Sequence, residues 1–482
     1  MTPTAEPIDT STLTYKQQQA AVGALIGAAV GDALGAPFEF KPRGMYGERF
    51  PKAILGGTGE MIGGGAFNWS PGEFTDDTQM AMALAAAILA EGGEFNAERA
   101  WSHFVAWSEQ SSDIGNTTRA SLSGSDYRTA SKLAHDDLGQ TDSNGSLMRI
   151  APVGIAGVRW GQEMTMRIAQ QQSELTHYDK TAGWSAAVAA EFIRHLILGG
   201  TLESGFESAI RRIEPEFQEK FEAKLSDDWN PMVSPSQSNG KAIICLAQAL
   251  WAVRTTSSFE DAIVAAVNLG DDADTVAAVT GAIAGAMYGI QQIPSRWVTY
   301  VHGHVRQPDG TDVVYRQHEI IEIAHHLLGL SPRPMNPPET IIPPTQIHDM
   351  GIYASNLLGA EKAPDSMGII SLCRMENRLL HHELRREFYI TDESREGHYP
   401  HLRFIVEDAV NAIEAFLREG REVLVHCHGG RSRTGFILKA WYMRRFNVDH
   451  YEAEQWIEGE WPHYAVWNTD FYDFLSNEWE QQ

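Results

Sequence analysis

Three short segments of this sequence carry side chains whose types and spacing could do chemistry. Two are acidic and combine Asp with Thr: Thr75, Asp76 and Asp77 in FTDDTQM, and Asp272, Asp274 and Thr275 in LGDDADTVAAV. The third, VLVHCHGGRSRTG, sets a cysteine among glycines and arginines near the end of the chain. Oxygen-rich clusters suit hard divalent cations, whereas a cysteine in a loop rich in glycine and arginine suits phosphate. The sequence therefore predicts two different sites.

The cysteine-containing loop begins with Cys427 and reaches Arg433 after five intervening residues. A β-branched run precedes it and helix-compatible residues follow it, so its backbone N–H groups should converge at a helix N-terminus. Such a loop binds a phosphate dianion and favours the thiolate form of the cysteine. A buried structural thiol is the alternative interpretation. The residues expected to bind phosphate are His428, Gly429, Gly430, Arg431, Ser432, Arg433 and Thr434.

The two acidic segments each stand at the expected start of a helix. Asp and Thr often cap helix N-termini, which is the structural alternative to a functional site for either segment alone. Capping does not require adjacent carboxylates, however, because neighbouring like charges repel one another. Clustered Asp and Thr oxygens without His or Cys are hard ligands that suit Mg²⁺ or Mn²⁺. Two such sets predict a site for two ions with a bridging water.

The elements that must position these residues fall into two regions. Ala-rich stretches with helical spacing predict an all-α domain at 16–330, after a flexible N-terminus at 1–15. Six prolines in sixteen residues then mark a linker at 331–344. Beyond it, β-branched runs alternate with helical stretches, which predicts a small α/β domain with a mostly parallel sheet at 345–482. In the first region, helices are expected at Gln17–Leu34, Thr78–Leu89, Ala97–Ser108, Lys180–Leu198, Gly240–Arg254, Phe259–Val267 and Asp274–Tyr288.

The composition limits the class of protein. A formal net charge of −25 argues against coating DNA or an anionic membrane, because both need clustered Lys and Arg. The three cysteines are too few and too scattered for a disulfide framework. The N-terminus lacks the features of a secretory signal, and no uninterrupted apolar run reaches 18 residues. We expect a cytoplasmic protein that acts as a monomer without DNA or membrane partners.

Four motifs of the first region resemble the ADP-ribosylglycohydrolase family, which includes dinitrogenase-reductase-activating glycohydrolase. They are GDALG with a following glutamate, FTDDTQM, NGSLMR and GDDADTVAAVTGAIAGAMYG, and together they span about residues 20–300. The resemblance implies two divalent ions and hydrolysis of an ADP-ribosyl glycosidic bond, with Asp77 and Asp113 assisting the chemistry. The implied metal ligands are Thr75, Asp76, Asp77, Asp272, Asp274 and Thr275. The implied substrate-binding residues are Glu39, Asp113, Asn144, Gly145, Ser146 and His177.

The cysteine-containing loop resembles the HCxxGxxR[ST]G signature of cysteine-based phosphatases in the dual-specificity branch, over roughly residues 345–482. The resemblance implies that Cys427 attacks phosphorus, that Arg433 binds the phosphate and that Asp392 protonates the leaving group. One position departs from the family pattern. Phe474 stands where a late glutamine is common, which puts the positioning of the hydrolytic water in doubt.

Together the two resemblances predict a bifunctional hydrolase. One domain would release ADP-ribose from a protein or a small-molecule conjugate, and the other would hydrolyse a phosphate monoester. The alternative is a glycohydrolase that carries an inactive, phosphate-binding module for targeting. A further alternative gives the first domain another metal-dependent hydrolysis, such as release of ADP-ribose from an acetylated derivative.

Overall fold

The chain folds into two compact units. The computed structural model describes residues 3–234, 238–331, 335–393, 399 and 401–479. One unit comprises Met1–Lys52, Met61–Ile293 and Tyr300–Pro332, and the other comprises Ala53–Glu60, Pro294–Thr299 and Arg333–Gln482. The main division along the chain therefore falls inside the predicted proline-rich linker. Residues 332–334 of that linker lie outside the described residues.

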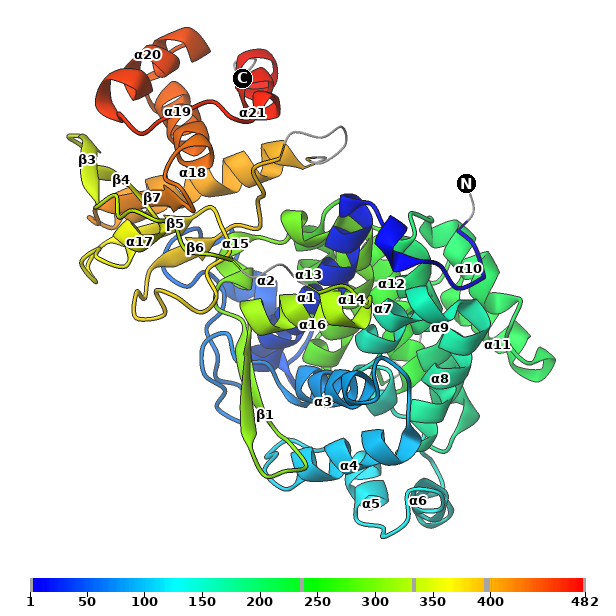
Figure 1. Cartoon of the computed structure of the whole chain (residues 1–482). Coiled ribbons are helices and arrows are strands. Elements are labelled where there is room, and N and C mark those ends of the chain that lie inside the picture. Colours follow the sequence, from blue (N-terminus) through cyan, green and yellow to red (C-terminus); the bar gives the residue numbers. More distant parts are fainter. Residues whose placement is uncertain (1–2, 235–237, 332–334, 394–398, 400, 480–482) are drawn as a thin grey trace. The chain divides into compact units, whose positions relative to one another are not determined.

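The first unit is built mainly of helices (Figure 1), as the Ala-rich periodicity predicts. Four of the predicted helices begin and end within one residue of the expected positions, and the others differ by at most two residues. The elements of this unit are η1 Thr10–Thr12, α1 Tyr15–Gly35, η2 Ala36–Phe38, α2 Met45–Arg49, α3 Asp76–Ala90, α4 Ala97–Ser108, α5 Asn116–Leu122, α6 Ala130–Leu138, η3 Asn144–Ser146, α7 Ala151–Trp160, α8 Gln162–Glu174, α9 Lys180–Ile197, α10 Leu202–Ile210, α11 Pro215–Leu225, α12 Ala242–Arg254, α13 Phe259–Val267, α14 Ala273–Tyr288, η4 Ile290–Gln292, β1 His302–Arg306, β2 Asp312–Arg316 and α16 Gln317–Leu327.

One element departs from the predicted all-α domain. Strands β1 and β2 form an antiparallel hairpin in which Arg306 pairs with Asp312. The turn between them contains Gly310 with φ of +83°, and the Gln307 N–H donates to the Thr311 carbonyl at 2.8 Å. An Asp-Gly pair between two short Val-containing runs is a known hairpin signal, and it was overlooked in the sequence.

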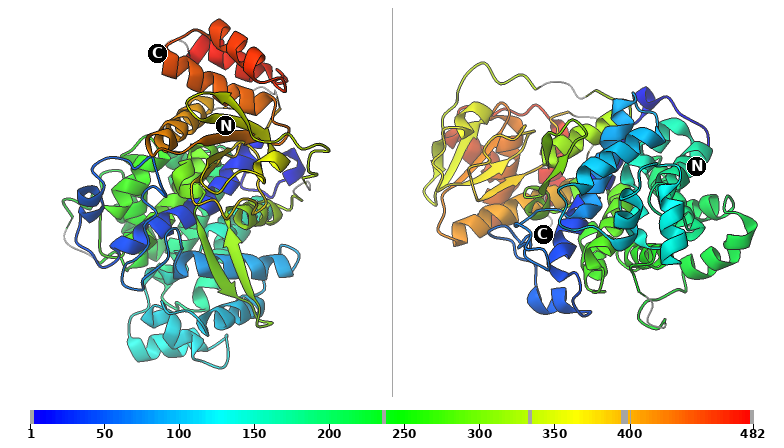
Figure 2. Two further views of the ribbon diagram at one scale, coloured as in Figure 1. Left: turned by 90° about the vertical axis from the view of Figure 1, so that its left-hand side faces the viewer. Right: turned by 90° about the horizontal axis from the view of Figure 1, so that it is seen from below.

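The first unit is organised around α1 and α14, which lie side by side among the other helices (Figures 1 and 2). Their backbones approach closely because α1 carries glycines four residues apart. A Cβ built on Gly27 would lie 2.2 Å from the Gly281 carbonyl oxygen, and one on Gly31 would lie 2.0 Å from that of Ala277. Although α1 is long and apolar enough to cross a membrane, its apolar window is completely buried within the unit. This packing brings the end of α1 to the start of α14.

We expect Gly31→Ala to lower the free energy of unfolding of the first unit by about 3 kcal/mol, because the added methyl group meets backbone and not a movable side chain. Thermal or urea unfolding of the purified variant measures this change. Gly183→Ala in α9 is the matched control, since its Cβ would meet neighbouring atoms only at 3.8 Å or more. Equal stability of the two variants would contradict the close approach of the helices.

The N-terminal segment, which we predicted to be flexible, makes specific contacts with the first unit. The Ala5 carbonyl accepts a hydrogen bond from the Gln162 N–H at 2.7 Å, and the Thr4 carbonyl accepts one from Arg194 at 3.0 Å. Thr14 then caps α1, where its side chain accepts from the Gln17 N–H. The segment is thus held by backbone carbonyls, which give no signal in the residue types.

The second unit contains the predicted α/β fold with a mostly parallel sheet. The strand order is β3–β4–β7–β5–β6, and only the β3–β4 pair is antiparallel. In Figure 2 the yellow and orange strands form one sheet beside the orange helices. The elements of this unit are α15 Ser295–Val298, β3 Thr345–His348, β4 Ile352–Asn356, α17 Leu357–Ala360, β5 Gly368–Ser371, β6 Arg385–Glu387, α18 Leu402–Arg418, β7 Val423–Cys427, α19 Ser432–Phe446, α20 His450–Glu460, α21 Thr469–Phe474 and the π-helix η5 Leu475–Trp479.

The central strand β7 is buried on both faces. Val423 and Val425 point into the core formed with α18 and α19, whereas Leu424 points into a smaller core on the other face with α17. A strand buried in this way reads as a continuous apolar run, which is the pattern of VLV before Cys427. The strand ends at Cys427 and therefore presents the cysteine at the carboxyl edge of the parallel sheet.

Candidate active sites

The acidic site of the first unit begins with a carboxylate that holds the start of α3. Asp32, near the end of α1, accepts hydrogen bonds from the Thr75 N–H at 2.9 and 3.1 Å and from the Thr78 N–H at 3.0 Å. These backbone donors belong to the first turn of α3, where N–H groups lack partners within the helix. Asp32 thus fixes the position of the neighbouring Asp76 and Asp77.

The two acidic segments meet although they are far apart in the sequence. The Thr275 hydroxyl donates to Asp77 Oδ2 at 3.3 Å, and the Thr75 hydroxyl lies 3.4 Å from the same oxygen. Ligand oxygens of Glu39, Asp272 and Asp274 lie within 4.8 Å of one another. The structure therefore brings the predicted ligands from the starts of α3 and α14 to one place, beside Glu39.

Helix capping does not account for these side chains. Thr75 and Asp272 are the N-cap residues of α3 and α14, and neither side chain accepts a capping hydrogen bond from its own helix. Instead Asp32 supplies the acceptor for α3, and the Asp272 N–H donates to Asn239 Oδ1 at 3.1 Å. The side-chain oxygens of Thr75 and Asp272 therefore do not cap their helices.

The electrostatics of this cluster favour a bound cation. Burial, followed by repulsion from neighbouring carboxylates, raises the pKa of Asp76, Asp77 and Asp274 well above its usual range. The same two causes raise the pKa of Glu39 to about 8. Asp77 Oδ1 and Glu39 Oε2 are buried and have no hydrogen-bond partner among the described residues. Buried, unpartnered carboxylate oxygens next to hydroxyls are a donor set that fits Mg²⁺ or Mn²⁺.

Two predicted substrate residues lie at this cluster. Burial, and then Asp32 and Asp272, raise the pKa of Asp113 to about 7, which places its carboxylate within the field of the cluster. The Asn144 amide donates to Asp272 Oδ2 at 2.7 Å and to the Asn239 carbonyl at 3.1 Å. The Asn144 side chain thus contacts an acidic oxygen of the cluster directly, and the Asp113 carboxylate interacts with the cluster electrostatically.

The other predicted substrate residues, Gly145, Ser146 and His177, hold the segment around Asn144 in place. His177 is buried, and its ring nitrogens are hydrogen-bonded with Ser143 Oγ at 2.9 Å and Thr176 Oγ1 at 2.8 Å. Burial lowers the pKa of His177 to about 3, so the ring is neutral. A Cβ on Gly145 would lie 2.9 Å from the His177 ring, and the buried Ser146 hydroxyl accepts from Ser173 at 2.7 Å. These contacts position Asn144.

The cysteine-containing loop of the second unit is fixed by its backbone. The Leu357 N–H donates to the His428 carbonyl at 3.2 Å, and the Trp461 indole N–H donates to the Gly430 carbonyl at 2.7 Å. Helix α19 begins at Ser432, so its N-terminus follows the loop directly. Cys427 is 2% exposed at the end of β7. The loop therefore has the strand–loop–helix geometry that holds an anion.

Of the two loop glycines, Gly430 is the one that the geometry requires. Its φ is +68°, and a Cβ there would lie 2.7 Å from the Ser355 carbonyl oxygen. A Cβ on Gly429 would meet only the Arg431 side chain, at 4.0 Å. The close approach predicted for both glycines is therefore found at Gly430.

We expect Gly430→Ala to reduce phosphate hydrolysis on the order of 10²-fold, because a displaced loop misplaces the groups that bind phosphate. The rest of the sheet does not depend on this turn, so far-UV circular dichroism should stay unchanged. Hydrolysis of p-nitrophenyl phosphate measures the effect. Gly459→Ala in α20, where a Cβ meets nothing within 4 Å, is the control. Full activity of Gly430→Ala would show that the loop tolerates a side chain there.

Arg433 and Asp392 come together beside the loop. Arg433 Nη1 donates to the Leu372 and Ile390 carbonyls at 2.9 and 3.0 Å, and its Nε lies 3.7 Å from Asp392 Oδ2. Burial opposes the charge of Arg433, but Cys427, Cys373 and Asp392 more than compensate and raise its pKa. Asp392 also accepts from the Ser432 hydroxyl at 2.9 Å. It lies in the loop after β6 and not at a strand end, and residues 394–398 of that loop are outside the described part.

The remaining loop residues divide between the anion site and its surroundings. The Thr434 hydroxyl is buried without a hydrogen-bond partner among the described residues, as expected of a donor that serves a bound thiolate or phosphate. Outside the loop, His428 Nε2 is hydrogen-bonded with the Asn336 carbonyl at 2.7 Å, and Arg431 lies over the Trp467 ring at 5.4 Å. The side chains of His428 and Arg431 thus contact Asn336 and Trp467. We therefore expect these two residues to bind phosphate through their backbone N–H groups and not through their side chains.

Phe474, at the position where glutamine is common, belongs to the core. It is buried, and its ring packs edge-on against Phe436 at 6.2 Å. The nearby Asn468 amide donates to the Tyr399 hydroxyl at 3.2 Å, and that hydroxyl donates to the Thr391 carbonyl at 2.6 Å. The segment therefore supports the Asp392 loop through Asn468, and Phe474 supplies no polar group to a water.

Comparison with known proteins agrees with the two sites. The model of the ADP-ribosylglycohydrolase family matches residues 13–336, about two thirds of the chain, and the model of the dual specificity phosphatase catalytic domain matches residues 372–481. The chain belongs to the ADP-ribosylglycohydrolase family. In this member of the family, the glycohydrolase domain is fused to a dual-specificity phosphatase catalytic domain.

Individual relatives match the glycohydrolase domain. The ADP-ribosylarginine hydrolase Tri1 of Serratia proteamaculans is 33% identical, over 65% of this chain and 80% of its own length. The ADP-ribosyl-[dinitrogen reductase] glycohydrolase of Rhodospirillum rubrum is 29% identical, over 58% of this chain and 89% of its own length. The solved structure of an ADP-ribosylglycohydrolase-related protein complex is 30% identical, covers 66% of this chain and all of that chain, and has a TM-score of 0.52.

Sequence reasoning missed three residues of this glycohydrolase site or gave them no role. Asp32 stood in a recognised motif, but its role as the anchor of α3 depends on a contact across 43 residues. Asn239 orients Asp272 and accepts from Asn144, and no motif marks it. Cys245 is buried, and burial raises the pKa of its thiol. The negative charges of Asp272 and Asp77 raise that pKa further.

Proposed function

We propose that this glycohydrolase–phosphatase fusion is a bifunctional hydrolase. Its first domain would cleave the bond between ribose C1″ of ADP-ribose and an acceptor, with Mg²⁺ or Mn²⁺ as cofactor, and its second would hydrolyse a phosphate monoester. The observation that carries the first activity is the meeting of the two acidic segments at the Thr275–Asp77 hydrogen bond. An oxygen-only cluster with unpartnered, buried carboxylate oxygens has no evident structural use.

The chain's own residues divide the work of glycosidic cleavage. Two divalent ions would be held by the residues of the two acidic segments, Thr75, Asp76, Asp77, Asp272, Asp274 and Thr275. When bound, the ions would neutralise the carboxylates and orient the ribose hydroxyls and a water. Asp113 and Asn144 would position the ribose beside this cluster. The water oxygen replaces the acceptor at C1″, and its proton passes through a carboxylate, Asp77 or Asp113, to the leaving atom. A carboxylate that faces the ribose, such as Asp113, would stabilise the oxocarbenium-like transition state.

The acceptor that we favour is an arginine side chain. Two of the similar proteins, from Serratia proteamaculans and Pseudomonas putida, are named ADP-ribosylarginine hydrolases, and each is 33% identical to this chain. Cleavage then breaks the bond between C1″ and a guanidinium nitrogen. Release of ADP-ribose from other protein or small-molecule conjugates is the alternative outcome of the test.

In the second domain, Cys427 would act as the nucleophile. Its sulfur attacks phosphorus while the phosphate ester bond breaks, Asp392 gives a proton to the leaving oxygen, and water then hydrolyses the phosphocysteine. Arg433 and the loop N–H groups bind the phosphoryl oxygens, and Thr434 stabilises the departing thiolate. The unpartnered Thr434 hydroxyl, in the first turn of the helix that follows the buried Cys427, supports an active enzyme over a module that only binds phosphate.

The experiment is a substrate panel with the full-length protein. Arginine-linked, serine-linked and O-acetyl ADP-ribose are incubated with Mg²⁺, with Mn²⁺ and with EDTA, and released ADP-ribose is quantified by chromatography. We expect release from the arginine conjugate that EDTA abolishes and either ion restores. Release from another conjugate alone would replace the acceptor, and release that persists in EDTA would overturn the metal assignment.

The cellular setting stays a prediction. A cytoplasmic location is our expectation from the small number and wide spacing of the cysteines in the sequence. A monomer without DNA or membrane partners is likewise our expectation from charge and composition. Fusion of the two domains motivates one further expectation, that both act on phosphorylated ADP-ribose or on a target with both modifications.

A further inference from the structure

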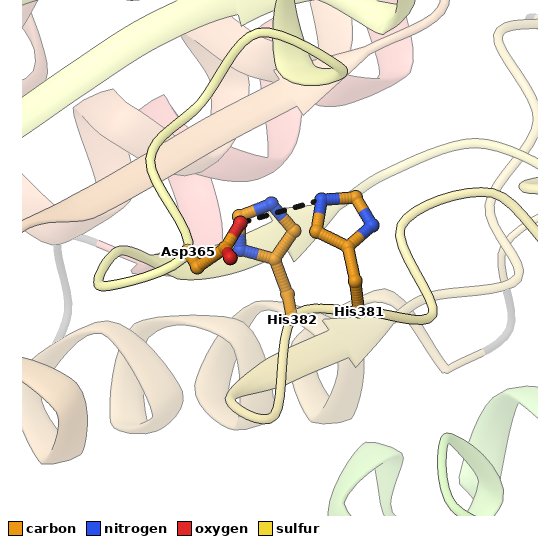
Figure 3. A group of neighbouring side chains, drawn as sticks. All are labelled: Asp365, His381 and His382. Atoms are coloured by element: carbon orange, nitrogen blue, oxygen red, sulfur yellow. Dashed lines mark ion pairs between the residues drawn. The ribbon is translucent and has the colours of Figure 1, made fainter.

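A cluster of two histidines and one aspartate lies in the phosphatase domain, away from its catalytic loop. Asp365, His381 and His382 each offer one ligand atom, and these atoms lie within 4.8 Å of one another. Figure 3 shows the three side chains converging from two loops, with Asp365 facing His381. Asp365 Oδ1 lies 3.7 Å from His381 Nε2, and the centroids of the two imidazole rings lie 4.4 Å apart.

The sheet topology places this cluster at the edge opposite Cys427. Asp365 precedes β5 and the histidines precede β6, and these strands are parallel to each other. Ile369 pairs with Arg385, so extension of that register sets Asp365 opposite His381. Cys427, in contrast, ends β7, which is also parallel to β5. The cluster is therefore separated from the catalytic loop by the length of a strand.

His382 is the residue that points to a ligand. It is completely buried, and neither of its ring nitrogens has a hydrogen-bond partner among the described residues. A buried polar group without a partner is costly and is often explained by an ion. Such nitrogens are available to coordinate a metal ion.

We propose that Asp365, His381 and His382 bind one Zn²⁺ ion, with water as the fourth ligand. Two imidazole nitrogens and a carboxylate oxygen form a ligand set typical of zinc. A tetrahedral zinc site needs ligand atoms about 3.3 Å apart. Because the atoms now lie within 4.8 Å of one another, the cluster has to close by up to about 1.5 Å. Asp365 and His381 are exposed at the surface and can make that movement. His382 is fixed by burial and by the hydrogen bond that its backbone N–H donates to the Leu379 carbonyl at 3.0 Å.

The site would fasten the segment between β5 and β6 to the start of β5. That segment begins at Leu372, whose carbonyl accepts from Arg433 and whose N–H donates to the His426 carbonyl at 2.9 Å. It continues through Glu376, Asn377 and Leu379, which have positive φ angles and so need tertiary contacts to hold them. A zinc ion at its far end would hold in place the backbone that supports Arg433.

The test measures Zn²⁺ affinity of the full-length protein by competition with a chromophoric chelator. Excess Mg²⁺ is present and the protein carries Cys427→Ser, so that neither the acidic cluster nor the thiolate takes zinc. We expect one tightly bound Zn²⁺ whose affinity falls at least roughly tenfold in His382→Asn and in Asp365→Asn. His463→Asn, an exposed histidine of the same domain outside the cluster, should bind as the parent does.

Two further measurements keep the test decisive. If His382→Asn fails to fold, the exposed His381→Gln replaces it, with unchanged circular dichroism as the requirement. Co²⁺ in place of Zn²⁺ should give the visible spectrum of a four-coordinate ion with nitrogen ligands, and His381→Gln should abolish it. Equal Zn²⁺ affinity in the parent, Asp365→Asn and His381→Gln would overturn the site.

Discussion

Replacement of Asp77 by Asn should abolish ADP-ribose release and leave phosphate hydrolysis intact. Asp77 connects the two acidic segments, because its Oδ2 accepts from Thr275 and lies beside the Thr75 hydroxyl, while its Oδ1 is buried and unpartnered. The amide removes the negative charge and one oxygen that a divalent ion requires. A metal supplies several kcal/mol of transition-state stabilisation, so we expect a loss on the order of 10³-fold in kcat/KM. Chromatographic detection of ADP-ribose measures it.

The matched control for this prediction is Asp137→Asn, which removes an exposed carboxylate of α6 with no role in the cluster. It should retain parental activity. The Asp77 variant should also fold, because loss of a buried negative charge relieves the repulsion that raises the pKa of its neighbours. Unchanged ADP-ribose release by a folded Asp77→Asn protein would remove the acidic cluster from the mechanism.

The second large effect is expected for Cys427→Ser. The hydroxyl is a far weaker nucleophile than the thiolate, so p-nitrophenyl phosphate hydrolysis should fall by at least about 10⁴-fold. Cys245→Ser, in the other domain, is the control that keeps phosphatase activity and excludes a general effect of thiol removal. Binding of inorganic phosphate or vanadate should survive in Cys427→Ser, because Arg433 and the loop N–H groups remain.

Thr434→Ala separates the two steps of the same reaction. Its buried hydroxyl has no partner among the described residues and is assigned to the thiolate that departs in the second step. We therefore expect an initial burst of p-nitrophenol followed by turnover roughly 10²-fold slower than in the parent. A loss without a burst would place the hydroxyl in the first step, and parental turnover would show that the thiolate needs no such donor.

Much of the fold was predictable because its signals are local. Ala- and Gly-rich periodicity marked the helices, as in α14, and the β-branched run before Cys427 marked the buried central strand. The β1–β2 hairpin was missed although its Asp-Gly turn is also local, because the helical pattern dominated the region. The bonds of Ala5 and Thr4 were not predictable, since they involve backbone carbonyls that every residue type carries.

The candidate sites were predictable where a motif keeps its residues together, and less so where folding assembles them. FTDDT and GDDADT identified the ligands at the starts of α3 and α14, but nothing in either segment indicates that Asp32 anchors one and Asn239 the other. The zinc cluster depends on a loop with left-handed residues such as Asn377, so the adjacent histidines in LLHHE could not be linked to Asp365 from spacing.

Our proposal requires that one chain carries two chemically independent hydrolytic sites. The most direct measurement assays both activities on four proteins: the parent, Asp77→Asn, Cys427→Ser and the double variant. We predict that Asp77→Asn loses only ADP-ribose release, that Cys427→Ser loses only phosphate hydrolysis, and that the double variant loses both. Loss of both activities in either folded single variant, or of neither, would contradict the claim.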